Sequence, residues 1–254
     1  MLTYISCAKT MIEKASFAEV STTLPVFQAQ AEAHAMELAG INRETLGAML
    51  RVNEKIAAEN ALRYGAFFTE TPPALPALFS YTGMVFKRIN AKDFSIEELL
   101  YAQEHLFITS FLYGLLRPLD LIKTYRLEGD VRLEQHNGKT MFQYWQDVLT
   151  DFFIAEIKKK GGVLINLASA EMKHLFDWNR VQREVRVITP EFITYKNGKA
   201  ATIVVYAKMC RGEMTRYILK NRIETVEELR NFSWEGFTYN VDSATDAPIF
   251  ELYT

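Results

Sequence analysis

The sequence predicts a mixed α/β fold, with a mixed central sheet flanked by helices, in one domain that spans residues 1–254. Apolar residues make up 49% of the chain and charged residues 24%, which is ordinary for a globular protein with a sizeable core. Short β-rich runs also alternate with segments of helical periodicity, as they do in α/β proteins. No internal repeat, low-complexity tract or linker divides the chain, so we expect a single domain.

The N-terminal region predicts one strand followed by three helices. Leu2–Ser6 is a short β-prone run that opens into the polar loop Cys7–Thr10, as expected of a first strand that ends at a site. Each helix begins with a residue suited to an N-terminus, and we expect them over Pro25–Gly40, Asn42–Leu50 and Asn53–Gly65. These short helices turn sharply on one another. They form either a helix-hairpin-helix-like lobe of the kind that sits on a DNA backbone or an ordinary helical lobe that covers a sheet.

The middle of the chain predicts a break and two further helices. Thr71–Pro76 cannot continue a helix, because it contains three prolines. Ser95-Ile-Glu-Glu98 has the capping-box spacing and starts a helix that reaches about Leu106. Phe107–Leu112 is predicted as a buried strand or a tight helix. Met141–Lys160 has helical spacing and ends in lysines and glycines, which a helix C-terminus favours.

The C-terminal region is predicted to be rich in strands. Val163–Leu167 is a continuous apolar run, typical of a strand covered on both faces. Three further β-rich runs are Val185–Ile188, Glu191–Tyr195 and Ala201–Tyr206, and Lys196–Lys199 predicts a hairpin turn between the last two. We expect a helix over Met209–Arg222 and a final strand near Ile249–Leu252.

The net charge and the spacing of the cysteines and histidines argue against a globally basic protein, a zinc site and a cysteine nucleophile. A net charge of -2 gives no global attraction to nucleic acid, so any anion binding depends on local clusters. Cys7 and Cys210 have no zinc spacing, and Cys7 has no evident histidine partner that would make it a nucleophile. No histidine pairs with another at i, i+4 spacing; the four are His34, His105, His136 and His174. We expect no metal and no cofactor.

The N-terminus lacks the basic and apolar regions of a signal peptide. No stretch approaches the roughly 18 apolar residues that a membrane span needs. We therefore expect a cytoplasmic protein that does not associate with membranes. We also expect a monomer.

The run Ser110–Gly129 is the most informative segment for function. Gly114 and Pro118 interrupt its hydrophobic sequence and predict a bend that shapes a pocket wall. Six of its polar residues are candidates for a site: Tyr113, Arg117, Asp120, Tyr125, Arg126 and Glu128. The arginines suit phosphate or carboxylate groups. Of the other four, Asp120, Glu128 and Tyr113 are candidate catalytic groups, although the two carboxylates are equally suited to pairing with the arginines in a structural network.

Three other clusters are each expected at the end of a strand. Ser6, Lys9 and Thr10 follow the first strand, and Asn166 and Ser169 follow the buried run that begins at Val163. The third cluster contains Lys208, Arg211 and Arg216. Each has an ordinary alternative, such as a solvated lysine, a helix cap or a solvated helix face. Because loops at the carboxyl ends of strands build the ligand crevice of α/β sheets, the clusters and the central run together predict an anion-binding cleft.

The candidates belong to motifs that run through nearly the whole chain: Ser6-Cys-Ala-Lys-Thr10, Leu112-Tyr-Gly-Leu-Leu-Arg-Pro-Leu-Asp120, Tyr125-Arg-Leu-Glu128, Asn166-Leu-Ala-Ser169, Arg211-Gly212 and Asn221-Arg222. These motifs resemble the signature of the YaaA peroxide-stress protein family. The resemblance implies a cytoplasmic bacterial protein that limits damage from unincorporated iron during hydrogen peroxide stress. It also implies a mixed α/β fold with a positively charged cleft and a helix-hairpin-helix-like element, for which DNA binding has been proposed.

Two functions remain open on the sequence. The first is binding of DNA or another nucleic acid through the basic clusters. The second is an unrecognised enzyme that acts on a nucleobase, a nucleotide or another anionic small molecule in the same cleft. Direct iron sequestration is disfavoured, because no histidines and carboxylates form a facial-triad motif.

Overall fold

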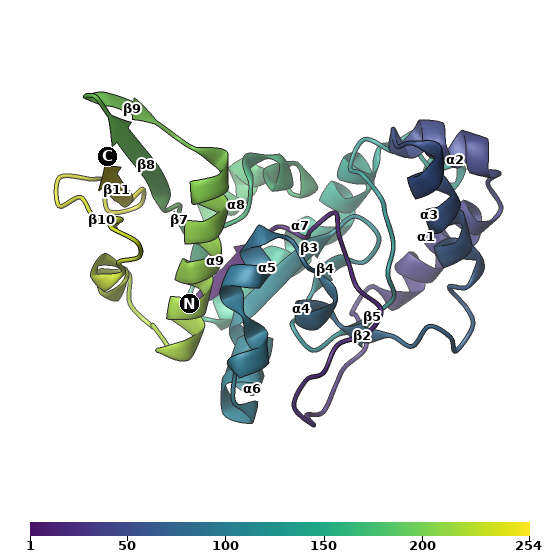
Figure 1. Ribbon diagram of the computed structural model, residues 1–254, viewed down its shortest axis with the longest axis horizontal. Coiled ribbons are helices and arrows are strands. Elements are labelled where there is room, and N and C mark those ends of the chain that lie inside the picture. Colours follow the sequence, from purple (N-terminus) through teal and green to yellow (C-terminus); the bar gives the residue numbers. More distant parts are fainter.

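A five-stranded sheet forms the centre of the computed structural model, which describes residues 1–254 (Figure 1). Its strands, in spatial order, are β4 (Gly114–Leu116), β3 (Leu106–Ser110), β1 (Leu2–Ile5), β6 (Val163–Asn166) and β7 (Arg186–Ile188). Neighbours from β3 to β7 pair in parallel, and β4 pairs antiparallel to β3. The predicted mixed central sheet is therefore confirmed, and the carboxyl ends of four strands lie at one edge.

A second sheet of four strands lies near the C-terminus of the chain (Figure 1). It contains, in spatial order, β10 (Thr238–Tyr239), β11 (Ile249–Tyr253), β8 (Glu191–Lys196) and β9 (Lys199–Ala201). The turn between β8 and β9 places Asn197 and Gly198 at φ of 51° and 73°, which suits a two-residue hairpin. The predicted hairpin is confirmed. A short pair, β2 (Leu75–Pro76) and β5 (Leu121–Ile122), is antiparallel.

The helices gather in distinct regions of the molecule. Their bounds are α1 Gln28–Ala39, α2 Arg43–Leu50, α3 Glu54–Gly65, α4 Ala77–Ser80, α5 Met84–Ile89, α6 Ile96–His105, α7 Met141–Lys159, α8 Trp178–Glu184 and α9 Val204–Lys220. Figure 1 shows α1, α2 and α3 together at the end of the molecule remote from the second sheet, with α5 beside α9. The 3-10 segments are η1 Ala91–Asp93, η2 Glu134–His136, η3 Ala170–Leu175 and η4 Glu227–Asn231. No helix is both long and apolar enough to cross a membrane.

Three predicted helix starts, at Asn42, Asn53 and Ser95, are confirmed by their capping bonds. The first helix begins at Gln28 and not at Pro25, and the last begins at Val204 and not at Met209. The Asn42 side chain accepts from the Thr45 N–H at 2.9 Å, and Asn53 caps α3 in the same way. The capping box at α6 has both of its bonds, between Ser95 and Glu98. These side chains satisfy N–H groups that have no partner inside the helix, which is why the sequence locates these starts well.

One predicted strand is wrong. Ala201–Tyr206 was expected to be β-structure, but β9 ends at Ala201 and α9 begins at Val204. The side chains of Val204 and Val205 are 63% and 51% exposed, so they do not pack as a buried strand would. Local β-propensity is overridden here because the residues that follow form one long helix packed along α5.

The turn from β3 into β4 depends on a glycine packed against an aromatic ring. Gly114 has a φ of +74°, and a Cβ added there would lie 2.7 Å from the Trp145 ring. Trp145 is fully buried on α7, and its Nε1–H donates to the Phe111 carbonyl at 2.7 Å. The bend predicted at Gly114 therefore exists, and it reverses the chain at the carboxyl edge of the sheet.

Candidate anion-binding cavity

A cavity of about 410 Å³ lies where the segments that follow β1 and β6 meet α5 and α9. It is lined by the loop Ser6–Thr10, by Tyr125–Glu128, and by residues of the segment that follows β6. The remaining wall comes from Gly83–Phe86, from Phe111, and from Lys208 and Arg211 on α9. The carboxyl edge of a parallel sheet therefore carries the cavity, which is the usual position of a ligand site in such folds.

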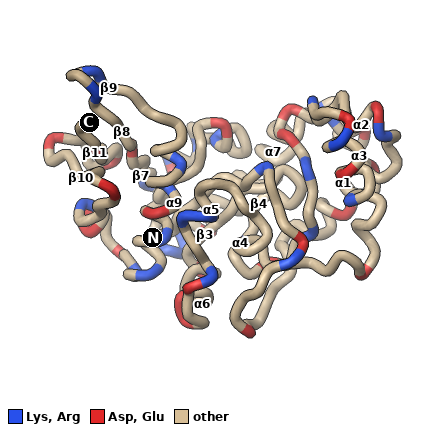
Figure 2. Tube along the Cα trace, in the orientation of Figure 1, with Lys and Arg blue, Asp and Glu red and all other residues tan.

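Four cationic side chains and two carboxylates line this cavity: Lys9, Arg126, Lys208, Arg211, Glu128 and Glu171. The local charge is thus positive, although the Cα trace in Figure 2 shows basic and acidic residues interspersed over the whole molecule. Burial lowers the pKa of Arg211, and this guanidinium forms no ion pair. A partly buried cation without a partner is unfavourable, so Arg211 is positioned to gain free energy from an anion.

Lys9 and Arg126 share one carboxylate. Lys9 Nζ lies 3.2 Å from Glu128 Oε2, and Arg126 Nη2 lies 2.7 Å from Glu128 Oε1. The backbone of Arg126 is fixed from the helical lobe, because the Tyr64 hydroxyl on α3 donates to its carbonyl at 2.6 Å. These two cations are therefore partly neutralised in the protein, unlike Lys208 and Arg211.

Hydroxyl groups connect the loops around the cavity. The Ser6 hydroxyl donates to Ser169 Oγ at 3.1 Å and accepts from the Ser169 N–H at 2.8 Å. The Thr82 hydroxyl donates to Thr10 Oγ1 at 3.0 Å. Ser169 precedes η3 without capping it by its side chain. The candidates Ser6, Thr10 and Ser169 thus hold three segments together at the cavity wall.

Tyr125 brings a buried hydroxyl to the cavity. Its Oη lies 2.8 Å from the Tyr81 hydroxyl and 2.7 Å from the Ser110 hydroxyl. Burial raises the pKa of Tyr125 well above its ordinary value, so the group stays neutral and serves as a hydrogen-bond donor or acceptor. Burial also raises the pKa of the neighbouring Cys7 thiol to about 12, which leaves too little thiolate for a nucleophile.

Arg117 and Asp120 lie outside the cavity, in a network of their own. Because β4 runs antiparallel to β3, the chain reaches Arg117 at the opposite edge of the sheet. Its guanidinium pairs with Glu156 at 2.7 Å and with Glu104 at 3.5 Å. The buried Asp120 carboxylate accepts from the Arg117 N–H at 2.7 Å and from the Thr23 hydroxyl at 2.6 Å. Burial raises the pKa of Asp120, but Asp120 does not line the cavity.

Tyr113 and Asn166 also make internal contacts and do not line the cavity. The Tyr113 hydroxyl accepts from the Lys123 N–H at 3.0 Å. The Asn166 amide donates to Thr189 Oγ1 at 3.2 Å, and its Oδ1 accepts from the Ala168 N–H at 3.2 Å. Asn166 thus holds the turn after β6, which is the ordinary alternative that the sequence had left open.

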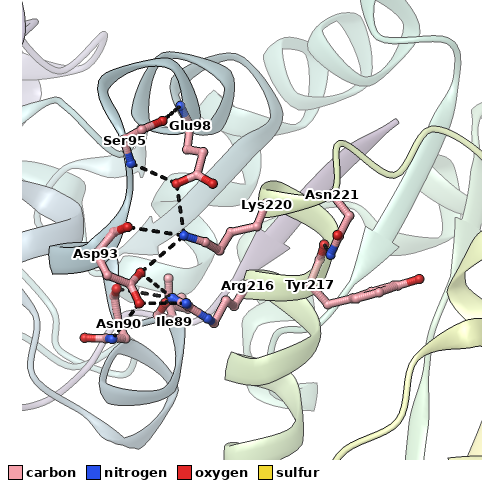
Figure 3. Close-up of polar contacts among 9 residues, drawn as sticks. All are labelled: Ile89, Asn90, Asp93, Ser95, Glu98, Arg216, Tyr217, Lys220 and Asn221. Atoms are coloured by element: carbon pink, nitrogen blue, oxygen red, sulfur yellow. Dashed lines mark hydrogen bonds and ion pairs between the residues drawn. The ribbon is translucent and has the colours of Figure 1, made fainter.

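Arg216 lies in an ion-pair network at the other end of α9 (Figure 3). Its two terminal nitrogens donate to the two oxygens of Asp93 at 2.6 and 2.7 Å, and Nη1 also donates to the Ile89 carbonyl. Lys220 joins the network through Glu98 at 3.1 Å. Figure 3 shows these side chains connecting α9 to the segment before α6. Arg216 is therefore already paired, and it does not line the cavity.

We expect Asp93→Asn to lower the free energy of unfolding by about 1 kcal/mol, because the pair is partly exposed. Hydrogen bonds from Arg216 lower the pKa of Asp93, so this contribution is present near neutral pH and is lost as the pH falls through the lowered pKa. Thermal unfolding at pH 7 and at acidic pH measures both effects. Asp242→Asn, at an exposed carboxylate outside the network, is the control; an equal effect in both variants would contradict this prediction.

Some of the cavity wall had no counterpart among the sequence candidates. Gly83–Phe86 at the start of α5 was missed, although Thr82-Gly83 before an apolar run is a helix-start signal. Glu171 and Met172 follow directly after a candidate loop and were passed over. Phe111 and Leu127 lie within the central run, but their sequence pattern is that of core residues. No local sequence signal distinguishes an apolar residue of a cavity wall from one of the core.

The fold and the cavity define an α/β protein with a cation-lined cavity at the carboxyl edge of its central sheet. The family model described as peroxide stress protein YaaA matches residues 1–243. The chain belongs to this family, which supports a role in peroxide stress and confirms the resemblance seen in the motifs.

Relatives match the chain over nearly its whole length. A UPF0246 protein of Bacteroides fragilis is 60% identical over 240 residues, covering 94% of this chain and 93% of its own. One from Phocaeicola vulgatus is 56% identical over 246 residues, covering 97% and 96%. One from Clostridium botulinum is 35% identical over 248 residues and covers 95% of both chains. The similarity therefore extends across nearly the whole fold described above.

No group of three or more His, Cys, Asp or Glu side chains is arranged to hold a metal ion. The carboxylates of the cavity are instead close to cations or exposed.

Proposed function

We propose that this protein acts in peroxide stress, in the cytoplasm, by binding DNA at the cavity. The observation that carries the proposal is Arg211, a partly buried guanidinium that lines the cavity and forms no ion pair. Lys208 lies three positions before it on the same helix and also lines the cavity without an ion pair. Residues at i, i+3 share a helix face, so the two cations present a joint site for a phosphate group.

The apolar wall gives the site a second kind of contact. Phe86 and Phe111 line the same cavity as the two cations. Aromatic rings stack on unpaired bases with little dependence on sequence, and cations bind the adjoining phosphates. A cavity of about 410 Å³ is large enough for part of a strand and too small for a duplex. We therefore propose that an unstacked nucleotide enters the cavity, as occurs in single-stranded or distorted DNA.

The helical lobe contributes less charge to this proposal. α2 and α3 pack closely, since a Cβ added at Gly47 would lie 3.0 Å from the Ala57 methyl group. We also propose that α2 and α3 act as a helix-hairpin-helix element. Its arginines are already engaged, however: Arg43 pairs with Glu54 at 2.9 Å and Arg51 with Asp130 at 2.6 Å. We assign the main phosphate contact to the cavity for this reason.

Binding of this kind offers a route to limiting iron damage without an iron site in the protein. Ferrous ions associate with the phosphates of DNA through electrostatic attraction. Lysine and arginine side chains that neutralise the same phosphates release the cations condensed there. Hydroxyl radicals would then form less often next to the DNA.

We expect Arg211→Ala to weaken binding of single-stranded DNA about tenfold at low salt, because it removes an unpaired cation from the site. The magnitude of the slope of log affinity against log salt should also fall, by roughly one phosphate contact. Fluorescence anisotropy with a labelled oligonucleotide measures both quantities.

Arg183→Ala, at an exposed arginine of α8 outside the cavity, is the matched control and should change affinity less than twofold. Single-stranded, duplex and branched DNA are compared at the same salt concentration. If none of the three binds at low salt, or if Arg211→Ala binds as well as the unmodified protein, the proposal is wrong.

A free anionic small molecule is a second candidate ligand, favoured by the volume of the cavity, which falls in the range of small-molecule sites. Turnover would have to use groups that line the cavity, and Tyr125 and Glu128 are the relevant candidates. Calorimetry with mononucleotides tests this candidate. Tight binding of a mononucleotide by a protein that does not bind DNA would favour it over the first.

A further inference from the structure

The cavity contains one ion-pair cluster whose geometry is incomplete. Glu128 lies between Lys9 and Arg126, with one carboxylate oxygen near each cation. The contact between Arg126 Nη2 and Glu128 Oε1 is short, at 2.7 Å, yet it is not aligned as a hydrogen bond. The Arg126 Nε–H, which is buried, also has no acceptor. Buried polar groups without partners are uncommon in folded proteins, and each requires an explanation.

The Arg126 Nε–H donor, which has no acceptor, indicates which kind of ligand group this arginine suits. A guanidinium binds an oxyanion best in the two-pronged arrangement, in which two N–H groups donate to two oxygens. Arg126 already donates from Nη1 to the Lys9 carbonyl at 3.3 Å. Its Nε and Nη2 groups remain for a two-pronged acceptor, and the Glu128 carboxylate does not reach Nε.

The Arg126 backbone is held independently of Glu128. The buried Tyr64 hydroxyl donates to the Arg126 carbonyl, and Lys9 lies on the loop that the Ser6 and Ser169 hydroxyls fix. Both cations therefore belong to anchored segments. The Glu128 side chain can leave its position without displacing either backbone segment.

We propose that Lys9 and Arg126 form a second oxyanion site in the cavity, which the Glu128 carboxylate occupies when no ligand is bound. A ligand with at least two phosphate groups then places one at Lys208 and Arg211 and displaces Glu128 with another. This inference rests on the proposed function and specifies its ligand as a phosphate-bearing chain with more than one oxyanion. Glu128 accordingly sets the affinity by competing for the second site, and it is not an acid or base.

The decisive variant is Glu128→Gln, which keeps the size of the side chain and removes the competing charge. We expect it to bind a 5′-phosphorylated thymidine dinucleotide about tenfold more tightly than the unmodified protein does. Inorganic phosphate should also raise the melting temperature of Glu128→Gln more than that of the unmodified protein, because it fills the vacated site. Isothermal calorimetry and thermal unfolding provide the two measurements.

Two controls separate competition from a general change of charge. Glu19→Gln removes an exposed carboxylate outside the cavity and corrects for net charge. Glu171→Gln removes the other cavity carboxylate, which forms no ion pair. In Glu128→Gln, a further Arg126→Ala substitution should abolish the gain. A gain that Glu171→Gln matches, or that survives loss of Arg126, would overturn the inference.

Lys9→Ala gives an independent test if Glu128→Gln does not fold. The Lys9 side chain is 69% exposed, so its removal is tolerated by the fold. Because Glu128 already offsets its charge, we expect Lys9→Ala to weaken dinucleotide binding less than Arg211→Ala does. A larger loss in Lys9→Ala than in Arg211→Ala would contradict competition by Glu128.

The outcomes distinguish this inference from the proposed function. If the unmodified protein binds DNA through Arg211 but Glu128→Gln binds no more tightly, the inference fails and the proposed function stands. If only Glu128→Gln binds phosphate and neither protein binds DNA, the second oxyanion site is supported and DNA is the wrong ligand. If neither protein binds the dinucleotide, phosphate or DNA, both are wrong.

Discussion

Gly212→Ala is expected to lower the free energy of unfolding by about 3 kcal/mol, which corresponds to a fall in Tm of roughly 10 °C. Gly212 is buried where α9 crosses α5. A Cβ added there would lie 2.4 Å from the Val85 carbonyl oxygen and 2.6 Å from the Arg88 Cβ. The backbone of α5 would have to move, because a carbonyl oxygen cannot turn aside as a flexible side chain does.

The same substitution should also affect the cavity. α5 supplies Val85 to the wall, and α9 supplies Lys208 and Arg211. Separating the two helices would therefore weaken ligand binding as well as stability. Circular dichroism melts and urea titrations measure the stability change.

Gly65→Ala is a matched control for this prediction. Gly65 ends α3, is exposed, and has no atom within 4 Å of an added Cβ. Alanine is favoured over glycine in a helix by about 1 kcal/mol, so this variant should be neutral or slightly stabilised. If Gly212→Ala behaves in the same way, the close approach of α9 to α5 does not constrain the fold.

Stability is expected to fall as the pH drops from about 6.5 to about 4, because His34 is buried as a neutral ring. Burial lowers the pKa of His34 from 6.5 to about 4. The unfolded chain therefore binds a proton in this range that the folded protein does not, and protons favour unfolding. The full contribution is present above the unfolded value, and at most about 3 kcal/mol is lost on acidification.

The surroundings of His34 explain why it stays neutral. Its Nδ1 lies 3.2 Å from the Leu112 carbonyl, which can only accept, so the ring proton resides on Nδ1. Its Nε2 is buried without a partner, and the rings of His136, Tyr144 and Trp145 surround it. A proton on Nε2 would have no acceptor.

His34→Asn should flatten this pH dependence, since the amide nitrogen can replace Nδ1 and does not titrate. Urea unfolding at several values between pH 4 and pH 7 gives the slope of stability against pH. The control is His174→Asn, because His174 is exposed to water in the folded protein. An unchanged slope in His34→Asn would show that other groups, such as His105, whose pKa burial also lowers to about 4, dominate acid unfolding.

Local signals predicted much of the fold. Asn42, Asn53 and the capping box at Ser95 located helix starts, because a cap bonds to residues two or three positions away. The strand predicted over Ala201–Tyr206 is wrong beyond Ala201, where β9 ends. Its β-branched residues favour a strand locally, whereas packing of the later part of α9 against α5 decides the helix.

The candidate site shows a similar division. Ser6, Lys9 and Ser169 follow strands β1 and β6, so parallel pairing of these strands brings their loops to one edge. Lys208 and Arg211 both reach the same cavity from α9, and no strand end lies directly before them as the sequence had predicted for this cluster. The wall from α5 had no polar motif to indicate it.

The sequence by itself determined the mixed α/β class, the main strand and helix starts, and the family, because these depend on local periodicity, caps and motif order. Only the tertiary structure decided which basic residues are available to a ligand. The sequence predicted Arg117 and Arg216 as anion-binding residues just as it predicted Arg211. In the structure, Arg117 pairs with Glu156 and Arg216 pairs with Asp93, and both carboxylates come from distant positions in the chain. The physical reason is that a cation's availability depends on the carboxylates that folding brings near it, and those contacts join residues far apart in the chain.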